Sequence, residues 1–363
     1  MIAMPRSVYV LGAGFSHSFN CEMFPLIRDF LRTAKANFVY NPEGDHRELA
    51  RVIATYFNDH YYPDIEKVLS FLSAAPLHNR IIPHEHRSVM YDELVEIIVI
   101  MLSMASQSKA DSVSTTDTYT RFALSLVDSE TTIITFNYDL LIDTLLMETN
   151  KWHRYDGYGV EIPLVDDAMP TPRTHFPRQP TRLITYSKAT LLKLHGSINW
   201  GSPTIFQDKS DAVYQLPVNG GVSIGDFAVQ TDVGSPFTMY FKPVLIPPIL
   251  DKSFWLRNPT FRVLWNMAME AIDDANTITF IGYSLPVTDF MAEFMFRQGI
   301  SMHSTETKIV VVDPNASELR KRYLDVFGSA SILDIKFKDC DFVSYANEML
   351  ASEEPRNADI PTP

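Results

Sequence analysis

Four short motifs, each at or just after the end of an apolar, β-like run, constrain the fold of this chain more than any other feature. They are Gly12–Ser16 (GAGFS), Thr135–Asp139 (TFNYD), Lys193–Gly196 (KLHG) and Gly282–Leu285 (GYSL). The carboxyl ends of the strands in an open α/β sheet form the ligand crevice, so motifs far apart in sequence can converge there. Together they supply a glycine turn, a carboxamide, a carboxylate and an imidazole. This set predicts an enzyme that handles a nucleotide.

The apolar runs alternate with segments of helical periodicity. Parallel-type strands are expected at Ser7–Leu11, Thr131–Thr135, Ala189–Leu194, Thr277–Ile281 and Lys308–Val312, with a short strand at Pro243–Ile246. Almost uninterrupted apolar runs are typical of parallel strands buried on both faces. Alternating strands and helices predict the α/β class, a doubly wound parallel sheet (Rossmann-like) with a helical insertion.

The chain is predicted to form a single domain over residues 1–350. Residues 36–127 are interpreted as a helical insertion, in which Leu94, Ile97, Ile98 and Met101 share one helical face. The proline- and glycine-rich composition of residues 150–188 and 200–240 predicts irregular excursions, the second with possible hairpins. The tail, residues 352–363, is predicted to be disordered.

Composition narrows the function class. The net charge of -13 over 363 residues argues against broad attraction to nucleic acid or to an anionic membrane. Two cysteines exclude a four-cysteine zinc site within one chain and fit a reducing cytoplasm. The best apolar run, Leu94–Leu102, contains Glu96 and falls far short of the ~20 residues that a membrane span needs. Met1–Gly14 runs directly into a strand, so no signal peptide is visible and a cytoplasmic location is expected.

A cluster of three histidines and one glutamate contains residue types that bind metals, but its spacing matches no standard metal site. The group consists of His78, His84, Glu85 and His86. We expect a solvated loop there and no bound metal.

The first two motifs each allow two interpretations. Gly12 and Gly14 would let the backbone approach a pyrophosphate at a helix N-terminus. However, His17 occupies the third glycine position of the dinucleotide fingerprint, so a tight turn that binds nothing is the alternative. Asn137 and Asp139 can face the crevice, or they can cap the following helix.

The later motifs are equally open. His195 can transfer protons near neutral pH, or it can be a buried histidine with a satisfied hydrogen bond. Gly282–Pro286 is not a nucleophile elbow, because proline stands where glycine is required. A turn that binds phosphate or ribose through its backbone and Ser284 is the better interpretation. Asn315, after the last apolar run, can contact a ribose or adenine, or belong to a simple turn.

The order of these motifs resembles that of the sirtuin family. More closely, Thr135–Asp139, Lys193–Ser197, Pro247–Pro248 and Ile281–Pro286 resemble the divergent bacterial sirtuin-like proteins. That group includes NAD-depleting effectors of anti-phage defence. The resemblance extends over roughly residues 5–35, 128–200 and 240–345, and leaves the helical insertion and the excursions uncovered.

The resemblance implies that the protein binds NAD as a substrate and breaks its nicotinamide–ribose bond. His195 would act as the general base beside the nicotinamide ribose, and Asn137 would orient the attacking water. The residues that would bind the rest of NAD are Gly12, Ala13, Gly14, Ser16, Asp139, Gly282, Ser284 and Asn315. Of these, Asp139 would line the nicotinamide end, and the last three would hold the adenosine half.

Two departures from the family pattern matter. Deacylases of this family usually carry a four-cysteine zinc module after the Leu-His-Gly motif, whereas this chain has only two cysteines and no zinc is expected. They also usually have glutamine at the position of Phe136. The resemblance therefore favours transfer to water, which gives nicotinamide and ADP-ribose, over acyl-lysine deacylation.

Two alternatives stay open. One is an NAD-dependent protein deacylase or ADP-ribosyltransferase, and the other is a non-catalytic subunit that binds NAD or ADP-ribose within an assembly. An unregulated NAD hydrolase would poison its host, so we expect gating by homo-oligomer assembly or by a partner. A HerA-type translocase ATPase or a short Argonaute is the kind of partner that the resemblance implies.

Overall fold

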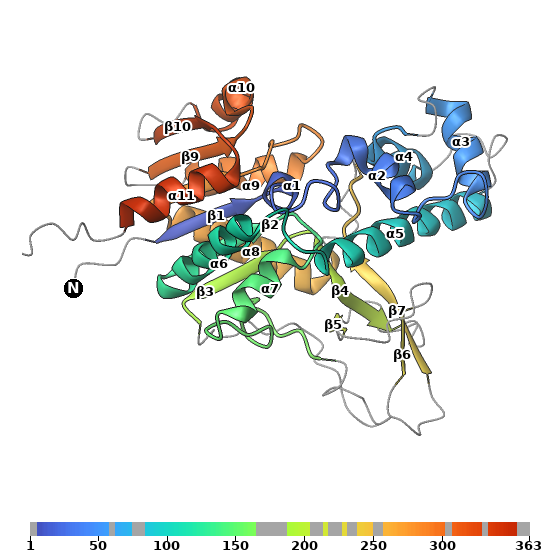
Figure 1. Cartoon of the computed structure of the whole chain (residues 1–363), viewed down its shortest axis with the longest axis horizontal. Helices are drawn as coiled ribbons and strands as arrows, with labels where there is room; N and C mark the ends of the chain where they lie inside the picture. Colours follow the sequence, from blue (N-terminus) through green and yellow to red (C-terminus); the bar gives the residue numbers. More distant parts are fainter. Residues whose placement is uncertain are drawn as a thin grey trace, which may run out of the picture.

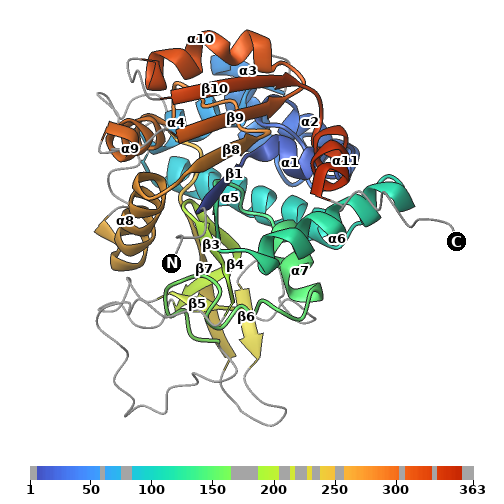
Figure 2. The ribbon, with the colours of Figure 1, turned by 90° about the vertical axis from the view of Figure 1, so that its left-hand side faces the viewer.

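A computed structural model describes residues 6–57, 62–74, 84–164, 187–203, 213–216, 227–230, 238–249, 257–301, 307–328 and 333–353 of the protein. Figures 1 and 2 show a central parallel sheet with helices on both faces, beside a second unit built from helices and a smaller sheet. The predicted tail lies largely outside the described residues; its first two residues end the last helix.

The central sheet has six parallel strands in the order β10-β9-β8-β1-β2-β3, which confirms the predicted fold class. The strands are β1 (Ser7–Leu11), β2 (Thr131–Thr135), β3 (Ala189–Lys193), β8 (Thr277–Ile281), β9 (Thr307–Asp313) and β10 (Leu333–Asp339). The chain builds β1, β2 and β3 on one side and then crosses to β8 beside β1. The topological switch point therefore lies between β1 and β8.

Two helical layers cover this sheet (Figure 2). One layer contains α1 (Ala13–His17), α6 (Val113–Asp128), α7 (Leu141–Glu148) and α11 (Phe342–Glu353). The other contains α8 (Pro259–Asp273), α9 (Phe290–Ser301) and α10 (Ala316–Phe327). Aromatic contacts join the first layer, since Phe15 of α1 packs on Phe122 of α6 and on Phe342 of α11.

Helix α6 corrects the expected boundary of the helical insertion. Although it falls within residues 36–127, its Tyr119 and Phe122 are buried in the core of the central sheet. The Tyr119 hydroxyl also donates a hydrogen bond of 2.6 Å to the carbonyl of Phe15. Helical periodicity predicts the helix, but it does not say which sheet the apolar face meets.

A second hydrophobic core joins the remaining helices to a four-stranded antiparallel sheet, β5-β4-β7-β6. The helical elements are η1 (Ile27–Asp29), α2 (Phe30–Ala36), α3 (Arg47–Phe57), α4 (Ile65–Ser73) and α5 (His84–Ser106). The strands are β4 (Gly196–Pro203), β5 (Tyr214–Gln215), β6 (Phe227–Gln230) and β7 (Thr238–Leu245). Leu69, Ile98 and Leu245 lie in this core.

Several local expectations are corrected here. Residues 200–240, expected to form an irregular excursion with possible hairpins, contain β5 and the antiparallel pair of β6 with the first part of β7. The short strand predicted near Pro243 belongs to β7 of the antiparallel sheet. Residues 150–164 are irregular but bury Trp152 and Tyr158 completely, and residues 165–186 lie outside the described part. His84–His86 begin α5 and do not form a loop, whereas His78 is not described.

Among the described residues, no helix combines the length and the apolar character needed to cross a membrane.

Candidate functional site

The strand register places the sequence motifs at one edge of the central sheet. Leu11 pairs with both Thr135 and Ile281, Thr135 pairs with Lys193, and Ile281 pairs with Val312. Five adjacent strands therefore reach the same level before the chain leaves the sheet. The loops that follow carry Gly12, Asn137, His195, Gly282 and Asn315, as the sequence predicts for a shared carboxyl edge.

The glycines of the first and last motifs pack directly against each other. The Gly14 amide donates to the Gly282 carbonyl at 3.0 Å, and a Cβ on Gly12 would lie 2.4 Å from that oxygen. A Cβ on Gly282 would lie 2.5 Å from the Gly14 backbone, and its φ of +58° lies in the left-handed region. The close approach seen here is thus between two loops. Ala13 and Gly14 remain at least partly exposed.

The side-chain amide of Asn137 has a fixed orientation. Its Nδ2 donates to the Gly12 carbonyl at 2.9 Å and to Ser16 Oγ at 3.2 Å. A carbonyl can only accept, so the nitrogen must face Gly12 and Oδ1 must point the other way. Asn137 is half-buried. An oriented amide at a strand end suits the positioning of a small polar molecule.

Asp139 lies behind Asn137 and supports it. Its Oδ2 accepts a 2.9 Å hydrogen bond from Ser16 Oγ, and its Oδ1 accepts from the amide of Leu141, the first residue of α7. Burial raises the pKa of the Asp139 carboxyl, against the opposing effect of Lys193. Asp139 therefore accepts from the first amide of α7, although Leu140 occupies the N-cap position. Asp139, Ser16 and Asn137 form a chain of hydrogen bonds that sets the amide, and the predicted contacts of Ser16 and Asp139 with a cofactor stay predictions.

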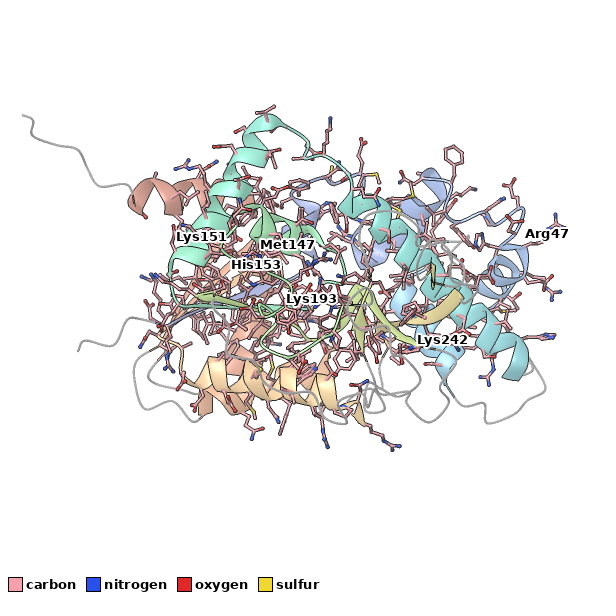
Figure 3. The ribbon with its side chains drawn as sticks, turned by 90° about the horizontal axis from the view of Figure 1, so that it is seen from below. Arg47, Met147, Lys151, His153, Lys193 and Lys242 are labelled. Atoms are coloured by element: carbon pink, nitrogen blue, oxygen red, sulfur yellow. The ribbon has the colours of Figure 1, made fainter. Side chains whose placement is uncertain are left out.

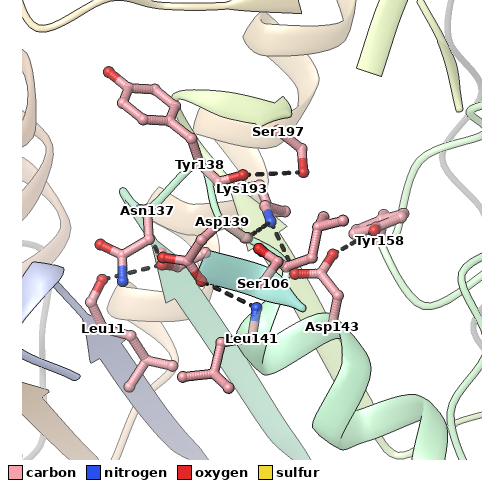
Figure 4. Close-up of polar contacts among 12 residues, drawn as sticks. Leu11, Ser106, Asn137, Tyr138, Asp139, Leu141, Asp143, Tyr158, Lys193 and Ser197 are labelled. Carbon is pink, nitrogen blue, oxygen red and sulfur yellow. Dashed lines mark hydrogen bonds and ion pairs between the residues drawn. The ribbon is translucent and has the colours of Figure 1, made fainter. Parts of the chain in front are cut away.

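A buried ion pair that sequence reasoning missed lies beneath this chain. Lys193 Nζ lies 2.8 Å from Asp143 Oδ2 and 2.5 Å from the Asp139 carbonyl (Figure 4). The Tyr158 hydroxyl donates to Asp143 Oδ1, and burial raises the pKa of this hydroxyl well above its usual range. Lys193 is fully buried, and Figure 3 shows it in the interior whereas Arg47 lies at the periphery. The available sequence signal for this buried pair was a lysine as the last residue of an otherwise apolar strand.

His195 lies directly after β3 in an aromatic setting. Its ring packs edge-on against Phe136 at 5.0 Å between centroids and is flanked by Tyr138 and Trp265. Only 6% of the residue is exposed, and its Nε2 lies 3.6 Å from Asp289 Oδ2. The His195 carbonyl accepts from the amide of Ile246, which ties it to the end of β7. Asp289 is a second residue that sequence reasoning missed, because nothing in its local pattern sets it apart.

Side chains of α10 hold the loop after β8 by donating hydrogen bonds to its backbone carbonyls. The Tyr283 carbonyl accepts from the Tyr323 hydroxyl at 2.6 Å, and the Ser284 carbonyl accepts from Arg322 at 2.7 Å, both from α10. Leu285 has a φ of +49°, which side-chain-bearing residues rarely adopt. The loop is therefore rigid, and Ser284 projects from it as an exposed residue.

Asn315 lies after β9 as the N-cap residue of α10 and is exposed. The backbone N–H of Asn315 donates to Asp313 Oδ1 at 2.8 Å, and burial raises the pKa of the Asp313 carboxyl. This hydrogen bond forms the simple turn that was one of the two interpretations of Asn315. The predicted contact of Asn315 with adenosine stays a prediction.

In the part of the chain that the structure describes, no group of three or more His, Cys, Asp or Glu side chains is placed to hold a metal ion. Cys21 is exposed and Cys340 is half-buried, and both are free thiols.

No protein-family model matches the chain, and a search of curated proteins finds no match. Solved structures with some similarity include a mutant Sir2 homologue in complex with 2′-O-acetyl ADP-ribose, with 13% identity, coverage of 96% of this chain and 91% of that chain, and a TM-score of 0.43. A Sir2 homologue in complex with NAD shares 11% identity over 96% of this chain and 88% of that chain, with a TM-score of 0.41. Sir2Tm bound to a propionylated peptide shares 13% identity over 95% and 92%, with a TM-score of 0.36.

Proposed function

We propose that this protein binds NAD at the carboxyl edge of its central sheet and hydrolyses the nicotinamide–ribose bond. One observation carries the proposal: the Asn137 amide is locked by Gly12 and Ser16 at the end of β2, level in register with the strand that presents His195. A nucleotide-binding sheet that only held its ligand would need neither an oriented amide nor an imidazole. The motif resemblance to sirtuin-like proteins supports the same assignment.

The reaction suits these two side chains. Breaking the bond develops oxocarbenium character on the ribose, and nicotinamide leaves as a neutral molecule, so its departure needs no general acid. The remaining task is to position water and stabilise charge. Asn137 Oδ1 orients the water, and His195 accepts its proton, directly or through a ribose hydroxyl. NAD and water thus give nicotinamide, ADP-ribose and one proton.

The rest of NAD is assigned to the neighbouring loops. The backbone at Ala13 and Gly14 would face the pyrophosphate, with Gly282, Ser284 and Asn315 toward the adenosine half. Besides their predicted contacts with NAD, Ser16 and Asp139 position Asn137 through the hydrogen bonds that join the three side chains. Asp139 and Ser16 are accordingly positioning residues in this proposal.

We further propose a cytoplasmic role as an NAD-depleting effector of anti-phage defence, gated by self-assembly or by a partner such as a HerA-type ATPase or a short Argonaute. Its support is the sequence resemblance, together with the toxicity that an ungated NAD hydrolase would have. The helical unit around α3–α5, which the resemblance leaves uncovered, is a candidate for receiving the signal.

The test is product analysis after incubation with NAD. Wild-type protein is expected to release nicotinamide and ADP-ribose, and Asn137→Ala and His195→Ala are each expected to slow release by about 100-fold or more, since a positioned general base contributes ~10²–10⁴-fold. Asn37→Ala, at a half-buried asparagine ending α2, and His153→Ala, at an exposed histidine, are matched controls. Unchanged turnover in the two site variants would overturn the assignment.

Stimulation of nicotinamide release by an acylated peptide would instead favour the deacylase alternative. Tight NAD binding without turnover, with or without candidate partners, would favour the binding-subunit alternative.

A further inference from the structure

The segment Pro286–Asp289 brings a carboxylate to the candidate general base. Asp289 Oδ2 lies 3.6 Å from His195 Nε2, and the side chains are only 4% and 7% exposed, respectively. A buried carboxylate needs compensating partners, because burial without them is costly. The imidazole, which carries a positive charge when it is protonated, can contribute to this compensation.

The remaining contacts of Asp289 orient it toward the ring. The Tyr283 hydroxyl donates to the same Oδ2 at 3.3 Å, and burial raises the pKa of this hydroxyl well above its usual range, so it stays a neutral donor. The Asp289 amide donates to the Pro286 carbonyl at 2.9 Å, which closes the turn before α9. The carboxylate is thus held from both its side chain and its backbone.

The imidazole itself has little freedom to turn away. Phe136 and Trp265 contact it with uncharged rings. The other titratable ring against it is Tyr138, whose pKa is raised well above its usual range by burial and whose hydroxyl donates to the Ile246 carbonyl at 2.6 Å. Among the described residues, Asp289 is therefore a carboxylate that lies close enough to His195 to act on its charge.

The segment is also anchored to the second unit. The Thr288 hydroxyl lies 3.0 Å from Glu66 Oε2, on the first turn of α4. The position of Asp289 consequently depends on the packing of α4 against the loop after β8. This contact links the helical unit to the imidazole through two consecutive residues.

We propose that Asp289 is a positioning residue for His195: its carboxylate orients the imidazole and stabilises the protonated form that arises when His195 accepts a proton. The catalytic meaning of this inference rests on the proposed NAD hydrolysis. A separation of 3.6 Å is long for a hydrogen bond, as is common for catalytic contacts before substrate binds. A small movement of either side chain closes it.

The direct test follows the imidazole and not the reaction. Proteins labelled with ¹³C at histidine Cε1 are titrated by NMR, with the His195 signal assigned from His195→Gln. A neighbouring carboxylate favours the protonated imidazole, so Asp289→Asn is expected to lower the titration midpoint by about one pH unit. Asp156→Asn, which alters another buried carboxylate, is the matched control and should leave the midpoint unchanged. An unchanged midpoint in Asp289→Asn overturns the proposal.

A second variant covers a failure of Asp289→Asn to fold. Asp289→Ala removes the carboxylate without burying an amide that needs new partners, and the same downward shift is expected. A midpoint equal to that of the wild type would contradict the inference in this variant as well.

Kinetics separate positioning from a merely structural role. Asp289→Asn is expected to lower kcat by about 10- to 100-fold, to leave KM for NAD within about threefold, and to move the acidic limb of the kcat profile to lower pH. A rise in KM with unchanged kcat would overturn the proposal. Absence of NAD turnover in the wild type would overturn the proposed function alone, because the NMR titration still decides what Asp289 does.

Discussion

At the scale of residues, the sequence predicts which side chains follow the strands, but not which of them face one another. Asn137 and His195 are predictable because each ends an apolar run, and strand ends are where an α/β sheet exposes chemistry. The sequence did not predict the roles of Lys193, Asp143 and Asp289, because these roles depend on burial and on partners far away in the chain. Asp139 shows the same limit, since both interpretations of its motif were reasonable and the structure joins its side chain to the first amide of α7.

The buried Lys193–Asp143 pair yields a stability prediction. Lys193→Met leaves Asp143 buried without its cation, and breaking such a pair typically costs ~3–5 kcal/mol of the free energy of unfolding. Urea denaturation measures the loss. Adding Asp143→Leu removes the stranded charge and is expected to restore part of the stability. Lys188→Met, at an exposed lysine just before β3, is the control. A loss below ~1 kcal/mol in the single variant would contradict the account.

At the scale of elements, five of the six strands of the central sheet were predictable because each contains a run of apolar or β-branched residues. The buried face of α5 at Leu94, Ile97, Ile98 and Met101 was predictable from its helical spacing, and all four residues are buried. The pairing of β4 with β7 in the antiparallel sheet was not predictable, because both strands contain proline or glycine and they lie far apart in the chain. The glycine motifs were open to a ligand site or a tight turn, and the structure adds a direct contact between the two loops that carry them.

This loop contact predicts the behaviour of Gly282→Ala. The new Cβ would lie 2.5 Å from the Gly14 backbone at a residue whose φ is +58°. We expect a loss of more than ~2 kcal/mol in the free energy of unfolding, because neither backbone can move far and the conformation is itself strained. Gly44→Ala is a matched control, since its Cβ would meet only the flexible side chain of Asn41. Equal stability of the two variants would show that the loops are not in tight contact.

Helix α5 carries a titrating carboxyl that makes stability depend on pH. Burial, reinforced by Glu96, raises the pKa of Glu93 from 4.5 to about 7. The folded state therefore binds this proton more tightly than the unfolded chain, so the contribution of Glu93 to stability is fully present below pH 4.5 and is lost as pH rises through about 7. Glu93→Gln is expected to remove about 1–3 kcal/mol of this decline. Denaturation curves at pH 5 and 7 measure it, and an unchanged slope would refute the assignment.

At the scale of the whole molecule, elements from both hydrophobic cores meet at the carboxyl edge of the central sheet, where the candidate site lies. The central sheet supplies Asn137, the loop after β8 supplies Asp289, and the second unit contacts this loop where Thr288 bonds to Glu66. A partner that shifted the second unit would therefore act on the imidazole without entering the site. This arrangement gives the proposed gating a physical route, and dependence of turnover on protein concentration or on a partner is its expected signature.

The measurement that tests the central claim most directly is NAD cleavage in ¹⁸O-labelled water, comparing the wild type with Asn137→Ala over a series of protein concentrations and with candidate partners. The account predicts equal amounts of nicotinamide and ADP-ribose, with one labelled oxygen on the ribose of the product and at least about 100-fold slower release by Asn137→Ala. Nicotinamide release without labelled ADP-ribose, or equal rates in the two proteins, would contradict it.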